Sequence, residues 1–286
     1  MTTLPETKTL ELELKQGWLT IWFNQPDNRN ALSDALVAEL AAVLKSVRED
    51  RTVRGITLRG RGGIFCAGAD LKNFKDNFQQ SGDRAAIIKM SSGAAEIFDL
   101  VNTAPQVVIV LIEGAAMAGG FGLACCADVV ICESGARFAM TETAIGVSPA
   151  QISPFVIQKL GYATGRRLML TAARFDGNEA HKLGFADFIA DDVAGLEAIE
   201  MQIRKQVLGA APGAVAATKE LLGQIAGKPR AEVIRLAAEN FADRMVSDEA
   251  KEGVASFLEK RQPDYPDTVS RDMPDFYPWW DEPEYR

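Results

Sequence analysis

The sequence predicts an α/β fold, and three observations support this class. Short apolar runs of strand length alternate with longer amphipathic stretches between residues 10 and 132. Two of the apolar runs are followed by glycine-rich turns. After Asp192 the strand signals end and helical periodicity replaces them. We therefore expect a strand-containing core over residues 1–192, a helical part over 193–262, and a tail over 263–286 that is rich in proline, aromatic and acidic residues.

The first elements follow from local patterns. Leucines alternate with charged residues over 10–15, as in a half-exposed strand, and Gly17 marks a turn to a partner strand over 18–23. Ser33 can cap the following helix. The apolar residues that share one face of this helix are Leu36, Leu40, Val43, Leu44 and Val47.

The next elements continue the alternation. We expect strands over 53–58, 107–112 and 129–132, a helix from about residue 83 to 101, and a short apolar helix over 121–127. The run at 107–112 has the β-branched content of a buried strand. Residues 72–82 show the weakest pattern, and residues 72–89 are expected to line a substrate pocket.

Composition excludes several classes of protein. The chain has 286 residues, of which 47% are hydrophobic and 24% charged, a balance typical of a globular protein with a large core. The formal net charge of -8 argues against a nucleic-acid partner, because phosphate binding requires a basic face. No apolar run reaches the length of a membrane span and the N-terminus has no signal-peptide pattern, so we expect no membrane partner.

The cysteines and the single histidine suggest neither a metal site nor a disulfide framework. Cys66, Cys125, Cys126 and Cys132 form no CxxC pair, so we expect reduced thiols in the cytoplasm and no bound metal. The sequence contains no GxSxG, HExxH or P-loop motif. The one histidine, His181, lies at what looks like an exposed helix end, where we expect a structural role. A nucleophile with a histidine base is therefore not expected.

Two glycine-rich turns remain as candidates for chemistry, at residues 65–70 and 118–120. Glycine there can simply allow backbones to pack closely. Alternatively, two turns that expose backbone N–H groups to one point make an oxyanion hole, and a helix that starts at the second turn adds its dipole.

A set of motifs in order gives these turns a context. They are Asn24-Gln25-Pro26 with Arg29-Asn30-Ala31-Leu32, Phe65-Cys66-Ala67-Gly68-Ala69-Asp70-Leu71, Gly119-Gly120-Phe121-Gly122-Leu123-Ala124 with Ala127-Asp128, Arg137-Phe138 with Glu142 and Ile145-Gly146, and Ala180 with Leu183-Gly184. From about residue 17 to 260 the chain thereby resembles the crotonase (enoyl-CoA hydratase/isomerase) superfamily.

The resemblance implies a crotonase-like spiral of ββα units with a C-terminal helical trimerisation part, assembled as a homotrimer or homohexamer. It implies an acyl-CoA substrate and no other cofactor, since the substrate carries its own coenzyme A. By motif position, the amides of Ala69 and Gly119 hold the thioester oxygen and Glu142 is the acid/base. The residues that the resemblance places against substrate are Arg29, Ala67, Asp70, Lys72, Gly120 and Gly122, with Phe241 and Lys260 reaching a neighbouring subunit's nucleotide.

One position departs from the family pattern. Hydratases of this family usually carry one glutamate two residues after the Gly-Gly pair and a second in the Phe…Glu…Gly motif. Here the first position is Gly122 and the second is Glu142. A carboxylate among small and apolar residues titrates high, which suits proton transfer near neutral pH. One glutamate is therefore expected to serve both proton steps, unless the substrate's own carboxylate or another group assists.

The segment 149–156 also departs, since the family commonly has a glycine-rich Pro-Gly-x-Gly-Gly-Thr where this chain has Pro-Ala-Gln-Ile-Ser-Pro-Phe-Val. Together with 119–124 and 170–177, it resembles the branch that hydrates 3-substituted glutaconyl-CoA, such as the isohexenylglutaconyl-CoA hydratases of acyclic terpene degradation and methylglutaconyl-CoA hydratases. Two alternatives stay open: another crotonase reaction, isomerisation or decarboxylation, and a non-catalytic acyl-CoA-binding protein. Two further expectations are that the aromatic tail docks on its own or a neighbouring subunit, and that alkylation of Cys66 weakens CoA binding.

Overall fold

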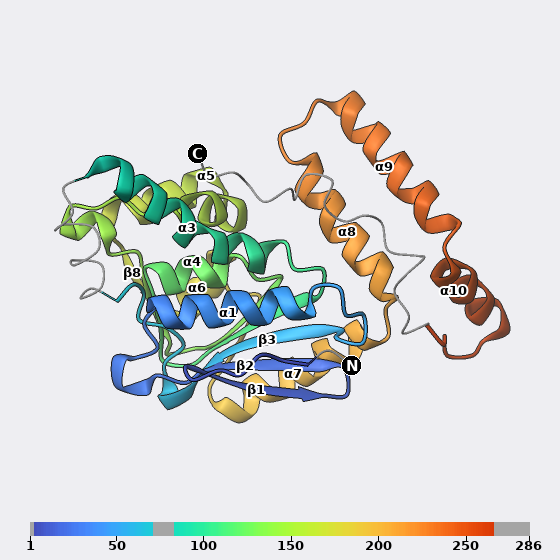
Figure 1. Ribbon diagram of the computed structural model, residues 1–286, viewed down its shortest axis with the longest axis horizontal. Helices are drawn as coiled ribbons and strands as arrows, with labels where there is room; N and C mark the ends of the chain where they lie inside the picture. The colour runs from blue at the N-terminus through green and yellow to red at the C-terminus, as the bar shows by residue number, and fades with distance from the viewer. Residues whose placement is uncertain (1–2, 71–82, 266–286) are drawn as a thin grey trace.

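The computed structural model describes residues 3–70 and 83–265. Its centre is a six-stranded sheet in the order β1-β2-β3-β4-β6-β9 (Figure 1). Only β1 and β2 pair antiparallel, and every other neighbouring pair in this sheet is parallel. The strands are β1 (Leu10–Lys15), β2 (Trp18–Phe23), β3 (Gly55–Gly60), β4 (Val107–Ile112), β6 (Val129–Glu133) and β9 (Phe188–Ala190).

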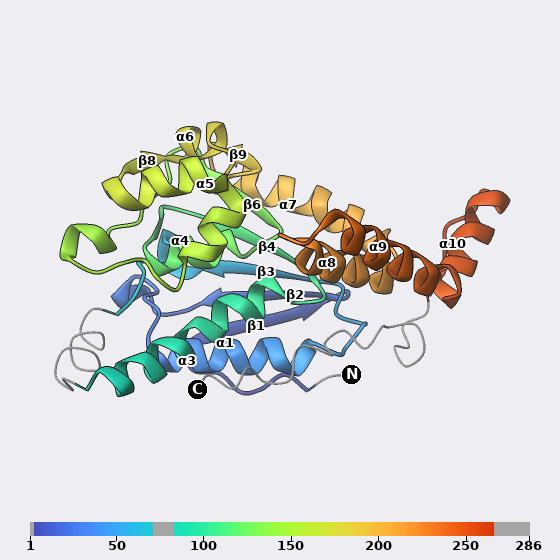
Figure 2. The ribbon, with the colours of Figure 1, turned by 90° about the horizontal axis from the view of Figure 1, so that it is seen from above.

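The sheet has two covered faces because side chains alternate along each strand. In β4, Val108, Val110 and Ile112 belong to the larger core, under α1 (Asp34–Val47) and α3 (Arg84–Asn102). Ile109 and Leu111 point to the opposite face, where α7 (Val193–Leu208) packs. The view from above shows α1 and α3 on one side of the strands and α7 on the other (Figure 2).

A smaller sheet, β5-β7-β8, stands beside the first. Its strands have three residues each: β5 (Ala115–Met117), β7 (Arg137–Ala139) and β8 (Arg174–Asp176). Between the two sheets lies α4 (Gly119–Cys125), and α5 (Ser153–Thr171) packs on α4. The remaining short elements of the core are α6 (Gly177–Lys182) and the 3-10 turns η1 (Pro26–Asn28), η2 (Arg61–Gly63) and η4 (Glu142–Ile145).

Three C-terminal helices form an arm that projects beyond the core (Figures 1 and 2). They are α8 (Pro212–Ile225), α9 (Arg230–Met245) and α10 (Asp248–Glu259). Lys219 of α8 joins the arm to the core through an ion pair of 2.6 Å with Asp128. The buried Glu249 of α10 accepts a hydrogen bond from the Gly213 amide at 2.8 Å and so closes α10 onto the start of α8.

The apolar face of this arm lies open in the single chain. No residue of α9 is buried. The large apolar side chains that are at least half exposed on the arm are Leu222, Ile234, Phe241, Met245, Val246, Val254, Phe257 and Leu258. Amphipathic helices normally bury such residues against another surface.

The expected α/β class is confirmed, and so are the predicted strands at the core and the helical C-terminal part. Ser33 caps α1, since its Oγ accepts from the Leu36 amide at 3.3 Å. The short helix begins at Gly119, two residues before the predicted start at 121. The helix end expected at His181 is the end of α6, whereas the sequence patterns missed α5, β9 and the small sheet. Of the tail, only 263–265 is described: the Asp264 amide donates to Glu252 at 2.7 Å, and Tyr265 is half-buried beside Gly253 of α10. The docking predicted for the other aromatic residues of the tail lies outside the described residues.

Among the helices in the described ranges, none combines the length and the apolar character that a membrane crossing requires.

Candidate active site

The two glycine-rich turns meet, and their glycines are needed for close packing. Cys66 and Ala116 form a parallel bridge, and the Met117 amide donates to the Cys66 carbonyl at 3.0 Å. Gly68 has φ +94°, and a Cβ on it would lie 2.8 Å from the Met117 oxygen. A Cβ on Gly120 would lie 2.7 Å from both Cβ and the carbonyl oxygen of Cys66. Gly120 therefore faces Cys66 inside the protein, and both turns hold a fixed position.

The second turn presents the start of α4. Ala118 has the unusual backbone angles φ 48° and ψ −119°, and its amide donates to the Ala139 carbonyl at 2.8 Å. The Gly122 amide makes the first bond of the helix, to the Ala118 carbonyl at 3.0 Å. Because the first amides of a helix have no partner within the helix, the Gly119 amide is left for a ligand.

Ala69 of the first turn lies beside Gly119. A Cβ placed on Gly119 would be 3.9 Å from the Ala69 amide nitrogen, 3.1 Å from Leu32 Cδ1 and 4.0 Å from Phe98 Cζ. The two backbone groups predicted to hold a thioester oxygen are therefore neighbours, and apolar side chains border them. This arrangement suits an oxyanion hole, in which preorganised donors meet the developing negative charge.

An aromatic cluster beneath α4 fixes this helix. Phe121 stacks on Phe185 with ring centroids 4.3 Å apart, and it meets Phe138 and Phe175 edge to face at 6.1 and 5.8 Å. Phe121, Phe138 and Phe185 are fully buried. Such ring pairs add to the free energy of burial and hold their partners in one orientation.

Glu142 opens the turn η4, which the Thr143 hydroxyl ties to α5 by donating to the Met169 carbonyl at 2.9 Å. The Glu142 Oε2 atom is buried and has no hydrogen-bond partner among the described residues. Burial raises the pKa of the Glu142 carboxyl above its ordinary value, while a bond to its own backbone opposes this in part. A carboxylate with one buried oxygen that lacks a partner is costly for folding and is characteristic of an acid/base group.

Gly122 faces a side chain, which explains the missing second glutamate. A Cβ on Gly122 would lie 2.1 Å from Cγ2 and 2.4 Å from Cβ of Ile152. Ile152 is 3% exposed and occupies the place where a side chain at position 122 would begin. The family's second carboxylate is thus excluded by packing as well as by the residue itself. The sequence carried a signal for this packing, because the branched Ile152 stands in a segment that is glycine-rich in the family.

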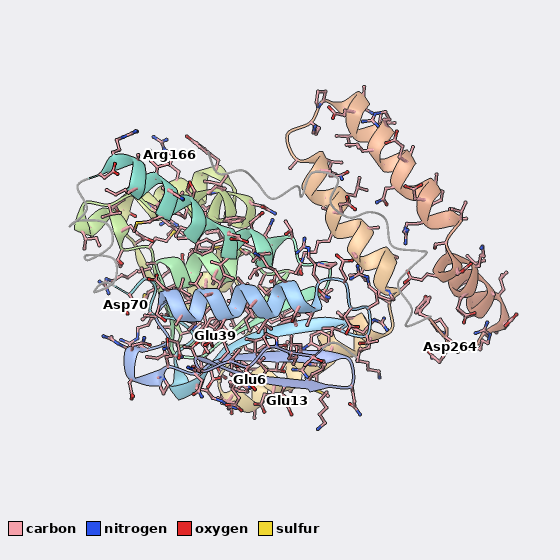
Figure 3. All side chains as sticks on the ribbon, in the orientation of Figure 1. Glu6, Glu13, Glu39, Asp70, Arg166 and Asp264 are labelled. Carbon is pink, nitrogen blue, oxygen red and sulfur yellow. The ribbon has the colours of Figure 1, made fainter. Side chains whose placement is uncertain are left out.

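The predicted coenzyme A contacts lie around the first turn. The Ala67 amide donates to the Arg29 carbonyl at 3.0 Å, so it is already used, and the Ala67 carbonyl is the group that can meet an adenine. Arg29 is exposed and has φ 56°, close to the two turns. Asp70 is half-buried at the end of the first turn (Figure 3). Lys72 lies outside the described residues.

Phe241 and Lys260, expected to reach a neighbouring subunit, lie on the projecting arm. Phe241 of α9 is 66% exposed, and Lys260 ends α10 with φ 54°. Asp70 by the site and Asp264 just beyond α10 stand at opposite ends of the molecule (Figure 3). The structure therefore does not bring Phe241 and Lys260 to the site of their own chain.

The expectation that alkylation of Cys66 weakens CoA binding is corrected by burial. The Cys66 side chain is fully buried, and burial raises the pKa of its thiol to about 12. Its Sγ accepts a bond from the Gly68 amide at 3.4 Å. A buried, protonated thiol is not reactive. The other three cysteines are buried and free as well.

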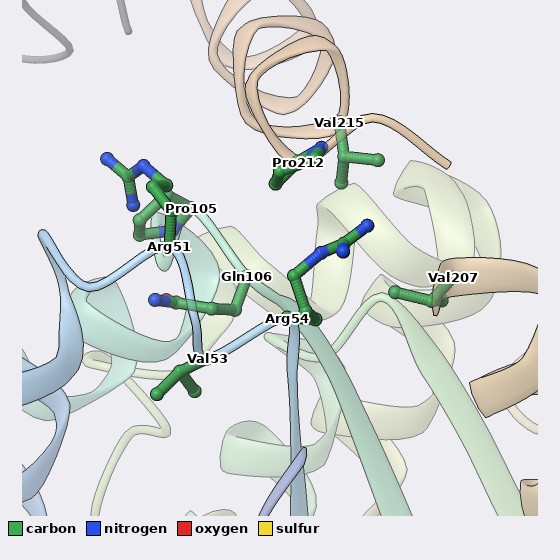
Figure 4. A pocket seen from close by; sticks show the side chains of 8 residues that line it. All are labelled: Arg51, Val53, Arg54, Pro105, Gln106, Val207, Pro212 and Val215. Atoms are coloured by element: carbon green, nitrogen blue, oxygen red, sulfur yellow. The ribbon is translucent and has the colours of Figure 1, made fainter. Parts of the chain in front are cut away.

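Two hollows lie away from this site. One, of about 10 Å³, is lined by Arg51, Arg54, Gln106 and apolar side chains and is far too small for a substrate (Figure 4). The other, of about 280 Å³, lies between α8 and the ends of α3 and α4. Because its lining includes Cys125 to Asp128, it is at the opposite end of α4 from the paired amides. His181 also has a structural contact, with Nδ1 2.9 Å from the Ala186 carbonyl.

The chain is similar to known proteins over most of its length. The model of the enoyl-CoA hydratase/isomerase family matches residues 13–268. Among curated proteins, human enoyl-CoA hydratase domain-containing protein 2, mitochondrial, is 30% identical over 255 residues, which are 87% of this chain and 86% of that protein.

Two solved structures are similar throughout. AtuE from Pseudomonas aeruginosa is 42% identical with a TM-score of 0.86, over 90% of this chain and 98% of that one. An enoyl-CoA hydratase/isomerase from Marinobacter aquaeolei is 40% identical with a TM-score of 0.84, over 89% of this chain and 98% of that one.

Proposed function

Because the chain belongs to the enoyl-CoA hydratase/isomerase family, and is a hydro-lyase of the enoyl-CoA hydratase type, we propose that it hydrates a 3-substituted glutaconyl-CoA with Glu142 as its single acid/base. The observation that carries the single-carboxylate mechanism is the contact of Ile152 with Gly122, which closes the place of a second glutamate. The motif pattern around residues 149–156 supports the branched substrate.

The reaction begins as conjugate addition of water. The water oxygen attacks the β-carbon of the enoyl thioester, and the Glu142 carboxylate takes one water proton. The electron pair of the double bond moves toward the thioester, whose oxygen becomes an enolate held by the Ala69 and Gly119 amides. Loss of one such donor in other enzymes costs about 3 kcal/mol, so this is a large contribution.

The same carboxyl completes the reaction. Glu142, now protonated, returns its proton to the α-carbon, which regenerates the carboxylate and the thioester carbonyl. Water has then been added across the double bond with no net change in the enzyme. The raised pKa of Glu142 suits both roles, because a group that must accept and donate works best when its pKa approaches the working pH.

The test is a set of CoA thioesters assayed in H₂¹⁸O. A 3-hydroxy-3-substituted product that contains one ¹⁸O supports the proposal. Isomerisation or decarboxylation would give a product without the label. Tight binding of the thioesters with no turnover would instead favour a non-catalytic acyl-CoA-binding protein.

For coenzyme A itself we propose backbone contacts from Ala67 and Ala69 to the adenine, and contacts of Arg29, Asp70 and Lys72 with the rest of the carrier. No cofactor other than the substrate's coenzyme A enters this reaction. Arg29→Ala should raise KM with little change in kcat, since the contact is remote from the reacting atoms. A kcat loss at unchanged KM would contradict it.

We further propose that the exposed apolar faces of α9 and α10 are buried in a homotrimer or homohexamer, in which Phe241 and Lys260 approach a neighbour's nucleotide. The support is the open face of the arm, which includes Phe257 at 82% exposure. Light scattering should show three or six chains per particle at micromolar concentration, and a single monomeric species would refute it. The free cysteines favour a reducing compartment, for which we propose the cytoplasm.

A further inference from the structure

One polar pair lies on the same segments as the apolar side chains that border the site. Leu32 and Phe98 border Gly119, and Ile152 covers Gly122 of the same helix. Phe98 in turn lies 6.0 Å from Phe155, ring to ring. The adjoining position of α3 that faces the same segment is Ser91, which accepts a hydrogen bond from the Gln151 side-chain amide.

The pair lies on the same two segments as the contact between Phe98 and Phe155. Ser91 and Phe98 are seven residues apart in α3, so they share one face of the helix. The rise of an α-helix places them roughly 10 Å apart along its axis. Gln151 directly precedes Ile152, and Phe155 lies four residues after Gln151, so the same two segments form both contacts.

The pair offers two hydrogen-bond donors. In the described part of the chain, Ser91 and Gln151 form this hydrogen bond with each other and no other side-chain bond. One proton of the Gln151 amide and the Ser91 hydroxyl proton are therefore available. If the oxygen and nitrogen of the Gln151 amide exchange places, the Ser91 hydroxyl donates to the amide oxygen and both amide protons are available. Either assignment leaves two donors and suits a carboxylate, which only accepts.

We propose that Gln151, positioned by Ser91, recognises the distal carboxylate of the acyl group and so makes the enzyme selective for glutaconyl-type thioesters, an inference that rests on the proposed function. The lengths agree. Four carbon–carbon bonds and one carboxylate oxygen place the acceptor about 6 Å from the thioester carbon, and a hydrogen bond adds about 3 Å. The sum is close to the roughly 10 Å of helix rise between Phe98, which borders Gly119, and Ser91.

The test compares two substrates that differ only in the carboxyl group, 3-methylglutaconyl-CoA and 3-methylbut-2-enoyl-CoA. For Gln151→Leu, the ratio of kcat/KM values between acid and neutral substrate should fall about ten- to a hundredfold, the effect of losing a hydrogen bond to a charged group. Ser91→Ala should lower the ratio less, and Gln151→Glu should lower it most, through charge repulsion. The matched control is Gln202→Leu on the exposed face of α7, which should leave the ratio unchanged.

Binding provides a readout independent of turnover. Calorimetry with glutaryl-CoA and butyryl-CoA should show the same loss of preference in Gln151→Leu. An unchanged preference in an enzyme that hydrates 3-methylglutaconyl-CoA would overturn the role of Gln151 and leave the proposed function intact. A wild-type enzyme that hydrates other enoyl thioesters but neither binds nor hydrates the glutaconyl type would overturn both.

Discussion

The two halves of the proposed site differ: backbone amides would hold the thioester oxygen in one half, and a single side chain, Glu142, would move protons in the other. The first half is packed so closely that a single added methyl group at Gly120 would come within 2.7 Å of Cys66. In the second half, the Glu142 Oε2 atom is buried without a partner. In the proposed site, rigidity and reactivity therefore have separate origins: close packing fixes the amides, and burial raises the pKa of the acid/base.

The largest expected effect is on the reactive half. Glu142→Gln keeps the shape of the side chain but removes the ionisable group, so kcat should fall by at least about 10². Binding of a substrate analogue should barely change, since the backbone amides remain. Turnover of wild-type enzyme in D₂O should place deuterium on the α-carbon.

The control is Glu179→Gln, the same change at an exposed position of α6. It should keep wild-type activity. Hydration at the wild-type rate by Glu142→Gln would show that another group moves the protons.

The next largest effect is expected at Gly122, which belongs to α4 but occupies the position of the family's second carboxylate. Gly122→Glu would restore the family's second carboxylate, but its Cβ would meet Ile152 at 2.1 Å. Overpacking of this kind typically costs about 1–3 kcal/mol. Urea unfolding should show this loss, together with lost activity on branched and linear substrates alike.

A double variant tests whether the clash with Ile152, and not the added carboxylate, causes the loss of stability. The clash is absent when position 152 is small, so Gly122→Glu should cost less unfolding free energy in an Ile152→Ala background than in the wild-type chain. If the single variant is as stable as wild type, Ile152 does not close this place.

A smaller change probes the rigid half alone. Gly120→Ala should lower the melting temperature and the oxyanion-dependent kcat, because the new methyl group must displace Cys66. Gly135→Ala is the matched control, since a Cβ there has no heavy atom within 4 Å among the described residues. Equal melting temperatures for the two variants would contradict the packing role of Gly120.

The smallest effect is the pH dependence. Because burial raises the pKa of Glu142, the acid limb of kcat/KM should lie above 4.5, the ordinary glutamate value. Activity falls as the pH drops through the raised pKa, since the base becomes protonated. A limb at or below 4.5 would contradict a desolvated carboxylate.

The raised pKa of Glu142 affects fold stability in the opposite direction from activity as the pH rises. In the unfolded chain Glu142 ionises first, so the fold loses stability as the pH rises from 4.5 through the raised pKa. Glu142→Gln lacks this loss and should melt no lower than wild type at pH 7. A clear drop in its melting temperature would indicate a structural role for the carboxylate.

Local signals predicted much of the fold. A capping residue and a one-sided apolar face identified α1, and continuous β-branched residues identified β4. The small sheet was missed because three-residue strands carry no measurable alternation. The helix α5 was missed because Gly161, with φ +72°, breaks its periodicity.

The site was predictable where it depends on the main chain and less so elsewhere. Glycines at positions 68, 119 and 120 revealed the turns, because few other residues allow such approach. The contact of Ile152 with Gly122 joins residues thirty positions apart, and the pair of Ser91 and Gln151 joins residues sixty apart. Such contacts depend on tertiary packing, which no local pattern encodes.

The packing of Ile152 on Gly122 also affects the order in which substitutions at these two positions can accumulate. A carboxylate at position 122 costs stability while Ile152 is present, so it is better accommodated once position 152 has become small. The reverse route begins with loss of the carboxylate and then fills the vacated volume with a branched side chain. Each position thus sets the cost of changes at the other, and a library that randomises position 122 alone would place every added carboxylate in a clash with Ile152.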